Sequence, residues 1–337
     1  MAEQYFQRIG VIGGGAWGTA LAQTLAEAGR DVSIWAYEEA TVSEINNDRI
    51  NRSFLAGVPL NPCITATGSI EKIAQNDLLL MVPPAQHIRR IARELKPYLA
   101  ARVPVLICSK GIERASGRLL GDILAEEFVD ATYGVLSGPS FAGEVARGMP
   151  TALTVACLEE TLSERIAAAL GSKTLRIYWT TDLIGVQLGG AVKNVLAIAA
   201  GIVEGKKLGS NAHAALVTRG FAEMRRFAGA LGARPDTLAG LSGLGDLLLT
   251  CSSVQSRNMS LGRALGEGRG LDDILAERKS VTEGIYTAAA VVKIAEEKNV
   301  DVPISAAVQA IVDGELSTDH AVDQLMARPL RAEADER

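Results

Sequence analysis

The strongest constraint on the fold is a glycine-rich turn near the N-terminus, placed between an apolar run and a helical pattern. Residues 8–12 form a β-rich run that ends in glycines, and residues 17–28 then have helical spacing, with Gly29 as the stop. Residues 31–36 form a second apolar run. A strand, a helix and a second strand in this order predict a βαβ unit, whose two strands lie parallel in one sheet.

The same alternation continues through the first half of the chain. Five further apolar runs are predicted to be strands, at residues 77–82, 103–108, 133–136, 151–157 and 175–179. Amphipathic helical patterns lie between several of them, as at residues 86–95 and 119–128. This pattern predicts an α/β fold with a doubly wound parallel sheet that helices cover on both faces.

The pattern changes after Trp179. From Asp182 onward there is almost no strand signal, and the clearest helical segments are residues 186–203, 212–231, 283–298 and 321–326. The length of 337 residues fits two domains. We therefore predict an α/β domain at residues 1–180, an all-helical C-terminal domain at 181–330 and a frayed, charged tail at 331–337.

Composition excludes several classes of protein. Lys plus Arg is 34 against 39 for Asp plus Glu, so nucleic-acid binding, which needs clustered basic residues, is not expected. The four cysteines are dispersed without a CxxC pair, as reduced thiols are in a cytosolic protein, and the three dispersed histidines predict no metal site. There is no signal-peptide pattern and no run of about 18 uncharged apolar residues. We expect a cytoplasmic protein without a membrane span.

The glycine turn fits the pattern GxGxxG through Gly13, Gly15 and Gly18. In a dinucleotide-binding turn the first glycine allows the tight bend, the second lets the backbone approach a pyrophosphate, and the third allows close packing of helix and sheet. The following helix would offer its N–H groups and positive dipole end to the phosphates. A plain glycine-rich turn is the alternative, and the βαβ setting favours the nucleotide.

The end of the second predicted strand bears on the type of cofactor. Tyr37 is followed there by Glu38 and Glu39, and no arginine occurs between Arg30 and Arg49. An acidic residue at this place can bind the ribose 2′-hydroxyl of NAD, whereas arginine accommodates the 2′-phosphate of NADP. The pattern mildly favours NAD, although the two glutamates equally suit the first turn of a helix.

Two loops at the carboxyl ends of predicted strands carry polar residues. Lys110 follows the run at residues 103–108 and could reach an anionic or carbonyl substrate, or it is a solvated loop lysine. Ser140 follows the run at residues 133–136 and is a helix cap, a ligand contact, or both.

Lys193 is the strongest chemical signal in the sequence. The helical segment 186–203 has only three polar side chains, Gln187, Lys193 and Asn194, so the helix is predicted to be buried. No carboxylate lies beside Lys193 on this helix, and a buried ammonium responds by lowering its pKa, which suits a general acid or base. The alternative is that the lysine extends to the surface.

Two later clusters suit the same site. Asp246 lies inside an apolar run, either as a helix N-cap or as the partner of a buried cation. Ser256 and Asn258 place neutral donors on both sides of Arg257, which is a suitable grip for a phosphate, although a surface arginine is the commoner explanation.

Together these segments resemble the bacterial-type NAD(P)-dependent glycerol-3-phosphate dehydrogenases, over about residues 8–328. The matching motifs occur in the family's order as GVIGGGAWGTALA, SKGIE, SGPSFA, DLIGVQLGGAVKNV, GLGDLLLTC, QSRN and TEG. The resemblance implies a Rossmann domain followed by a helical substrate-binding domain. It also implies reversible hydride transfer between NAD(P)H and dihydroxyacetone phosphate, which gives sn-glycerol 3-phosphate for phospholipid synthesis. The apolar helical domain in addition makes us expect a homodimer.

The resemblance implies roles for single residues, with Lys193 as the proton donor and acceptor. The substrate positions are Lys110, Gly138, Ser140, Lys193, Asp246, Ser256, Arg257 and Asn258. With the glycine turn included, the cofactor positions are Gly13, Gly15, Ala16, Trp17, Gly18, Tyr37, Lys110, Ala142, Arg257, Val281 and Glu283.

The chain departs from the family pattern at three places. Ala16 replaces the usual serine of the first loop, and the Arg or His that many relatives carry near Tyr37 is absent, which weakens the case for NADPH. Thr282 stands where valine is common and adds one hydroxyl.

Two rival functions share parts of the pattern. A β-hydroxyacid dehydrogenase also combines a Rossmann domain with a buried lysine, and a dinucleotide-sensing module would have no need of Lys193.

Overall fold

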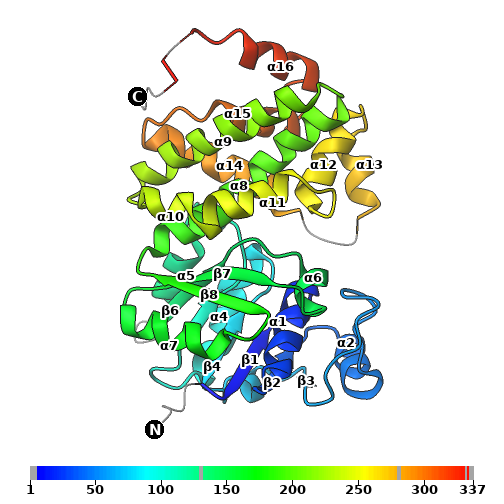
Figure 1. The fold of residues 1–337 in the computed structure, drawn as a ribbon, viewed down its shortest axis with the longest axis vertical. Helices are drawn as coiled ribbons and strands as arrows, with labels where there is room; N and C mark the ends of the chain where they lie inside the picture. Colours follow the sequence, from blue (N-terminus) through cyan, green and yellow to red (C-terminus); the bar gives the residue numbers. More distant parts are fainter. Residues whose placement is uncertain (1–5, 129–131, 279–281, 331, 334–337) are drawn as a thin grey trace. The chain divides into compact units, whose positions relative to one another are not determined.

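The computed structural model describes residues 6–128, 132–278, 282–330 and 332–333 (Figure 1). Most of the predicted tail at residues 331–337 therefore lies outside the described residues. The chain divides into two compact units. The first comprises Met1–Lys110 and Arg118–Gln187, and the second comprises Gly111–Gly117 and Leu188–Arg337.

The first unit is built on an eight-stranded sheet with the order β3-β2-β1-β4-β5-β6-β7-β8 (Figure 1). The strands are β1 (Arg8–Ile12), β2 (Asp31–Trp35), β3 (Thr65–Thr67), β4 (Leu78–Met81), β5 (Val105–Ile107), β6 (Tyr133–Ser137), β7 (Thr151–Cys157) and β8 (Leu175–Thr180). Neighbouring strands are parallel except β6 and β7, which pair antiparallel.

The sequence predicted seven of these strands. It missed β3, which has only three residues and no apolar run. The expectation of a wholly parallel sheet is wrong at β6–β7, because an apolar run shows that a strand is buried and not which way it runs. A predominantly parallel sheet followed by a helical unit nevertheless confirms the predicted fold class.

Side chains alternate between two hydrophobic cores, one on each face of the sheet. In β4, Leu78 and Leu80 belong to one core, while Leu79 and Met81 belong to the other. The first core receives apolar side chains from α1 (Ala16–Glu27), α6 (Ala142–Ala146) and α7 (Glu160–Leu170). The second receives them from α3 (Ile70–Ile73), α4 (Ile88–Leu95) and α5 (Leu120–Glu127). Short helical segments complete the unit. They are α2 (Glu39–Ser43), η1 (Glu44–Asp48), η2 (Ala85–His87) and η3 (Lys96–Tyr98).

The strand order reverses between β1 and β4, which places a topological switch point at their carboxyl ends. Ligands of open α/β sheets bind in the crevice outside the carboxyl ends of the strands at such a point. The glycine turn follows β1, and Lys110 follows β5, which lies beyond β4 in the same parallel part of the sheet. The topology therefore brings both segments to the carboxyl ends of the parallel strands.

The described part of the second unit contains helices and no strand after β8 (Figure 1). The helices from Leu183 onward are α8 (Leu183–Gly205), α9 (Ser210–Ala230), α10 (Pro235–Ala239), η4 (Leu241–Gly245), α11 (Asp246–Cys251), α12 (Arg257–Gly266), α13 (Leu271–Ala276), α14 (Glu283–Glu297), α15 (Pro303–Val312) and α16 (Thr318–Met326). The sequence identified α8, α9, α14 and α16. Elements of five or six residues, such as α10 and α13, are too short to show a helical period.

The long apolar helix α8 forms the centre of the second unit. A Cβ atom on Gly201 would lie 2.1 Å from the backbone oxygen of Met259, and one on Gly262 would lie 1.9 Å from that of Ile198. Glycines thus let α8 and α12 pack backbone to backbone. With 23 residues and a mean hydropathy of 1.6, α8 is long and apolar enough to cross a membrane, but 94% of its most apolar window is buried inside the protein. The sequence prediction of no membrane span was based only on runs of uncharged apolar residues. The charged Lys193 interrupts the apolar run that forms α8.

Candidate functional site

Each glycine of the turn after β1 has a distinct spatial requirement. Gly13 has a φ of +126°, which favours glycine, and its N–H donates to the Trp35 carbonyl at 2.9 Å. A Cβ atom on Gly18 would lie 2.0 Å from the Gly13 oxygen, so only glycine fits where α1 meets the turn. At Gly15, by contrast, an added Cβ would meet nothing within 4 Å. The turn therefore leaves an open space beside the Gly15 backbone.

This open space lies at the start of α1. Gly15 is the N-cap residue of α1 in an extended conformation, no described side chain caps the helix, and its first turn contains no acidic residue. Ala16 adds only a methyl group at the first helical position, and Trp17 packs against the adjoining core, as Ala142 of α6 also does. Free N–H groups, a positive dipole end and an open backbone fit the pyrophosphate of a dinucleotide.

Two opposite charges lie near the end of β2, where the adenine ribose of a dinucleotide would bind. Glu38 and Glu39 follow Tyr37 in the chain, and Tyr37 is 74% exposed. The guanidinium of Arg90, from α4, lies 5.9 Å from the centre of the Tyr37 ring. Sequence reasoning missed this arginine because it considered only residues next to Tyr37 in the chain. Arg90 therefore places a positive charge near Tyr37 from a distant part of the chain.

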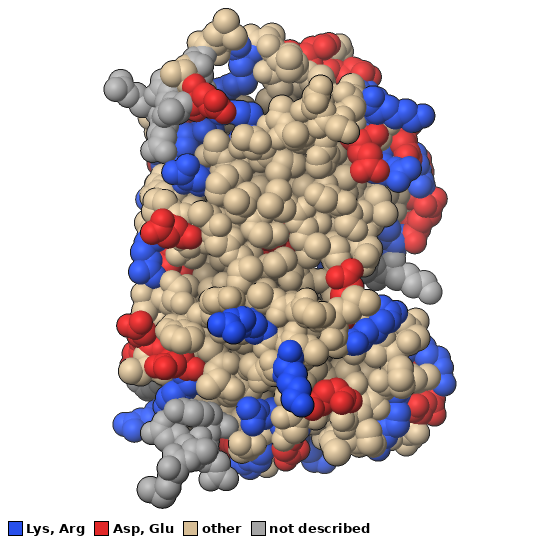
Figure 2. Space-filling view, viewed as in Figure 1, with Lys and Arg blue, Asp and Glu red and all other residues tan. Residues whose placement is uncertain are grey.

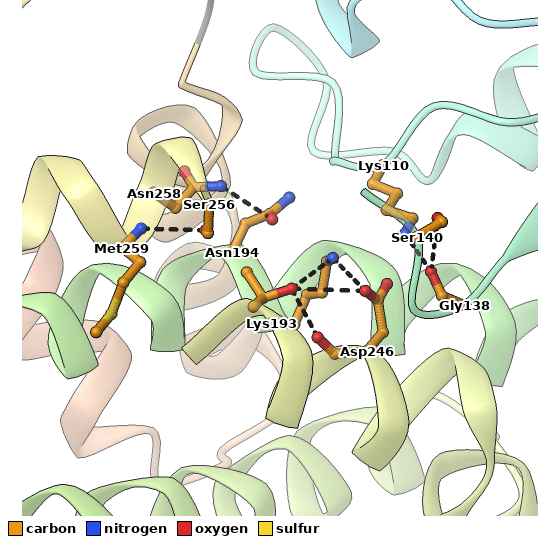
Figure 3. A network of polar contacts seen from close by, with 10 residues as sticks. Lys110, Gly138, Ser140, Lys193, Asn194, Asp246, Ser256, Asn258 and Met259 are labelled. Carbon is orange, nitrogen blue, oxygen red and sulfur yellow. Dashed lines mark hydrogen bonds and ion pairs between the residues drawn. The ribbon is translucent and has the colours of Figure 1, made fainter. Parts of the chain in front are cut away.

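Lys110 and Ser140 converge on one carbonyl group at the carboxyl edge of the sheet. Lys110 Nζ donates to the Gly138 oxygen at 3.0 Å, and Ser140 Oγ donates to the same oxygen at 3.1 Å (Figure 3). Lys110 is partly buried, so it is not a solvated loop lysine. The N-cap residue of α6 is Phe141, so the prediction of Ser140 as a helix cap is wrong. The structure joins three of the predicted substrate positions through the Gly138 carbonyl.

Lys193 is buried in the second unit and paired with Asp246. The lysine is 7% exposed and Asp246 is fully buried, which excludes the surface-lysine alternative. Nζ donates to Asp246 Oδ1 at 2.5 Å and to Thr250 Oγ1 at 2.8 Å (Figure 3). Asp246 begins α11 and Gly245 is its N-cap residue, so the aspartate is the partner of the cation and not a helix cap.

Thr250 is a contact of Lys193 that sequence reasoning did not single out. Its Oγ1 donates to the Asp246 backbone oxygen at 2.6 Å, one helical turn earlier, and so turns a lone pair toward Nζ. The ammonium is thereby held by one charged and one neutral acceptor. A buried ammonium is stable only when it is paired and hydrogen-bonded. In this state Lys193 can act as a proton donor of fixed direction.

A second polar network surrounds the N-terminus of α12 in the same unit. Asn258 Nδ2 donates to Asn194 Oδ1 at 2.9 Å (Figure 3). Asn258 Oδ1 accepts from the Gly284 N–H at 3.0 Å. Ser256 is the N-cap residue of α12, and its Oγ accepts from the Met259 N–H at 3.2 Å. The Ser256 hydroxyl keeps its own O–H for donation. The network fixes the start of α12, which is suited to an anion.

Arg257 and Glu283 lie at the starts of α12 and α14. Burial lowers the pKa of the Arg257 guanidinium, and the nearby Glu283 carboxylate partly offsets this effect. The hydroxyl of Thr282, before Glu283, is buried and has no hydrogen-bond partner among the described residues, so it can receive a ligand. The predicted cofactor residue Val281 lies outside the described residues.

The predicted site residues thus fall into local groups within each unit. The first unit contains the glycine turn and the Lys110–Gly138–Ser140 group, and the second contains the Lys193 pair and the α12 network. No group of three or more His, Cys, Asp or Glu residues that could hold a metal ion occurs in the described part of the chain.

Comparison with known proteins places the whole chain in one family. The family model for the NAD-dependent glycerol-3-phosphate dehydrogenase N-terminus matches residues 8–163, and the model for the C-terminus matches residues 182–323. The glycerol-3-phosphate dehydrogenase [NAD(P)+] of Parvibaculum lavamentivorans is 53% identical over 97% of this chain and 98% of its own length. That of Caulobacter vibrioides is 54% identical over 98% of this chain and 99% of its own length.

A solved structure agrees with these relatives. The crystal structure of glycerol-3-phosphate dehydrogenase from Coxiella burnetii has a TM-score of 0.92 at 37% identity, covering 96% of this chain and 99% of its own. The resemblance drawn from the ordered motifs is therefore confirmed. The chain belongs to the family of NAD-dependent glycerol-3-phosphate dehydrogenases, which are NAD(P)-dependent oxidoreductases acting on a CH–OH group.

Proposed function

We propose that this chain is a glycerol-3-phosphate dehydrogenase that interconverts dihydroxyacetone phosphate and sn-glycerol 3-phosphate, the latter serving glycerophospholipid synthesis. The observation that carries the proposal is the buried Lys193–Asp246 pair in a chain that also has an open glycine turn at a helix N-terminus. Residues 1–180 are proposed to bind the dinucleotide, and residues 181–330 to bind the substrate and perform proton transfer. The enzyme is proposed to work in the cytoplasm as a homodimer.

The proposed chemistry is a hydride transfer coupled to a proton transfer. NAD(P)H, when bound, would supply the hydride that reduces C2 of the ketone. Lys193 donates a proton from Nζ to the carbonyl oxygen, which becomes the C2 hydroxyl, and the neutral amine then regains a proton from solvent. In the reverse direction the neutral amine removes the hydroxyl proton. Asp246 and Thr250 hold Nζ in one direction throughout.

The start of α12 is proposed to hold the substrate phosphate. Arg257 supplies the charge, the helix supplies N–H groups, and Ser256 and Asn258 supply neutral donors. Lys110, Gly138 and Ser140 are proposed to contact the substrate as well. Binding energy from the phosphate, which does not react, is available to position the reacting carbon.

The cofactor is proposed to be held by the glycine turn and the residues around it. Gly13, Gly15 and Gly18 shape the pyrophosphate cradle, and Ala16 and Trp17 begin the helix that faces it. The further proposed contacts are Tyr37, Lys110, Ala142, Arg257, Val281 and Glu283. Because Arg90 lies near Tyr37, the 2′-phosphate of NADPH has a candidate partner that the sequence did not reveal.

The test is to follow the absorbance of NADH and of NADPH separately, with dihydroxyacetone phosphate as the acceptor. We expect turnover with this acceptor and little with a keto or semialdehyde acid. Turnover with the acid alone would assign the chain to the β-hydroxyacid dehydrogenases. Binding of NADH without turnover on any acceptor would identify a dinucleotide-sensing module instead.

A further inference from the structure

The two edges of the eight-stranded sheet differ in how their backbone is protected. At the β3 edge, Asn46 Nδ2 donates to the Ala66 oxygen at 2.9 Å, and Asn46 Oδ1 accepts from the Ala66 N–H at 2.8 Å. The side-chain amide makes the bonds that an added strand would make. An edge closed in this way cannot accept another strand.

The opposite edge, β8, has its hydrogen-bonding direction set by its register with β7. Thr151 pairs with Leu175, and the Thr151 N–H donates to the Thr174 oxygen at 2.8 Å. In a parallel ladder with this register, the backbone groups of alternate residues face the partner strand. The N–H and C=O groups of Arg176 and Tyr178 therefore face β7, and those of Leu175, Ile177 and Trp179 face away from it.

Among the described residues, only the first of these outward-facing residues, Leu175, has its backbone groups hydrogen-bonded by the chain itself. Ser172 Oγ accepts from the Leu175 N–H at 3.0 Å, and the Leu175 oxygen accepts from the Ser172 N–H at 2.8 Å. No strand within the described ranges lies on the outer side of Ile177 and Trp179. Tyr178 is 47% exposed and Trp179 is 46% exposed. An open edge next to exposed aromatic rings is the usual site of pairing with another chain.

We propose that β8 is the contact between two copies of this chain, with Tyr178 on the two-fold axis, an inference that rests on the homodimer proposed above. Antiparallel pairing about that axis places Ile177 opposite the partner's Trp179, so the outward N–H and C=O groups of both residues bond to each other. Tyr178 then faces its own counterpart. This arrangement is self-complementary, as a two-fold interface requires.

The charges beside β8 also suit a second copy. A groove between α7 and β8 is lined by Glu164 together with Lys173 and Arg176, so both signs lie on one surface. Basic side chains over the β7–β8 region are visible on the face in Figure 2. A two-fold axis can place the glutamate of each copy against the basic residues of the other. A purely basic or purely acidic edge would repel its own copy.

The register gives a cross-linking test. Residues opposite each other in a non-hydrogen-bonded antiparallel pair have Cα atoms about 4.5 Å apart, within the range that a disulfide spans. Tyr178→Cys, in a Cys63→Ser background that removes the exposed thiol, should form a covalent dimer on mild oxidation. Arg176→Cys in the same background is the matched control. In this register it faces the partner's Thr180 and should not cross-link to itself.

Sedimentation velocity gives the second test. Trp179→Pro removes an outward N–H and leaves the ladder to β7 intact, so the wild-type dimer should become a monomer with unchanged secondary structure. A monomeric wild-type protein would overturn the proposal. So would a dimer that withstands Trp179→Pro, or equal cross-linking of the two cysteine variants. Pairing of β8 with a different protein would appear as a wild-type monomer with no Tyr178→Cys homodimer.

A second inference rests on a separate observation, the buried amide of Asn51. This residue is fully buried in the long connection between β2 and β3. Its Nδ2 donates to the Gly14 oxygen and to Thr19 Oγ1, both at 2.8 Å, and its Oδ1 accepts from the Phe54 N–H at 3.1 Å. The amide nitrogen thus joins the connection to the glycine turn and to α1, and the amide oxygen is bonded within the connection.

The Gly14 oxygen determines the direction of the next N–H. In a planar trans peptide the C=O of Gly14 and the N–H of Gly15 point in opposite directions. With the oxygen held inward by Asn51, the Gly15 N–H points away from the protein interior, and the space beside Gly15 is open. We infer that Asn51 is a positioning residue that directs this N–H toward the pyrophosphate. The inference rests on the cofactor role proposed above.

Binding measurements test this inference without turnover. Asn51→Leu should weaken both NADH and ADP-ribose by about tenfold, as loss of a buried hydrogen bond does. The matched control is Asn46→Leu, which removes a similar amide bound to β3, and it should change the melting temperature but not the affinity. Thr19→Val, which removes one of the two partners of Asn51 Nδ2, should weaken binding less.

The outcomes separate the two hypotheses. Wild-type protein that binds NADH while Asn51→Leu binds it equally well would overturn the positioning role and leave the proposed function intact. Wild-type protein that does not bind NADH would remove the proposed function itself, and the positioning role with it.

Discussion

The glycine turn of the first unit and the lysine cluster of the second are the two proposed ligand sites, and they use different chemical groups of the chain. The turn presents backbone N–H groups, and its requirements are spatial: a Cβ on Gly18 collides with Gly13, whereas one on Gly15 has room. The cluster presents side chains, and its requirements are electrostatic. Lys193 is held by Asp246 and Thr250, which lie 53 and 57 positions further along the chain.

This difference predicts how each region fails. A larger side chain in the turn acts sterically, because it fills space beside the backbone. It should therefore weaken the binding of any ligand that contacts the backbone. A substitution in the cluster removes a charge or a proton donor and should affect the chemical step. The following predictions test this separation, beginning with the largest expected effect.

Lys193→Ala should lower kcat by roughly two to four orders of magnitude, which is the usual contribution of a general acid. The affinity for NADH should stay near that of the wild type, because the glycine turn lies in the other unit. Steady-state kinetics combined with titration of NADH fluorescence measures both quantities. A variant that keeps most of its turnover would remove the lysine from the mechanism.

Gly18→Ala and Gly15→Ala form a matched pair within the turn. The new Cβ on Gly18 would lie 2.0 Å from a backbone oxygen, so this variant should lose both thermal stability and NADH binding. The Cβ on Gly15 meets no protein atom within 4 Å, so this variant should keep its melting temperature and lose affinity alone. Calorimetry and NADH titration distinguish the two. Unchanged NADH affinity in Gly15→Ala would mean that the open space is not the pyrophosphate site.

Arg257→Ala should mainly raise the KM for dihydroxyacetone phosphate, by about tenfold to a hundredfold, as loss of a charged hydrogen bond does. The kcat should change little, because the arginine is proposed to hold a group that does not react. Initial rates over a range of substrate concentrations show the split. A change in thermal stability alone would contradict the phosphate role.

Glu223 shows that a buried charge in the second unit can be structural. Its carboxylate accepts from the N–H groups of Ile304 and Ser305 and from the Ser305 hydroxyl. Burial raises its pKa above the ordinary value of 4.5, and these donors partly oppose the rise. The folded state therefore holds the proton more tightly than the unfolded state. The resulting stabilisation is complete below the unfolded pKa and is lost as the pH rises through the folded pKa.

Glu223→Gln should remove this part of the pH dependence, while kcat at neutral pH stays close to that of the wild type. Urea unfolding at several pH values above 4.5 measures the difference in free energy between the two proteins. Parallel pH profiles for the wild type and the variant would show that the carboxyl group is not the source.

The sequence predicted the glycine turn well because the pattern that identifies it lies within a few residues. A strand, three spaced glycines and a helix start are all adjacent in the chain. Gly13 is required by its positive φ, and Gly18 is required because the Gly13 oxygen lies so close. Lys193 was identified for a similar reason, since an isolated charge in an apolar helix is visible without a partner. In the same way, the ordered motifs sufficed to identify the family.

The sequence did not reveal groups that meet across long separations. Arg90 lies beside Tyr37 from a helix about fifty residues later, Asn51 reaches back to Gly14, and Thr250 completes the lysine cluster. The sequence allowed Asp246 to be either a helix N-cap or the partner of a buried cation. Only the packing of α11 against α8 decided between these two roles. The antiparallel β6–β7 pair was missed for the same reason, because strand direction is settled by the path of the chain.

The amino-acid sequence by itself determined which segments become strands and helices, where the backbone must be glycine, and which lysine would be buried. Those properties follow from local sterics and from the periodicity of apolar residues, which act over a few positions. The tertiary structure alone decided which acceptors surround that lysine, which amide holds the glycine turn, and which sheet edge stays open. Hydrogen bonds and ion pairs act over about 3 Å, so distant residues interact only after packing has brought them together.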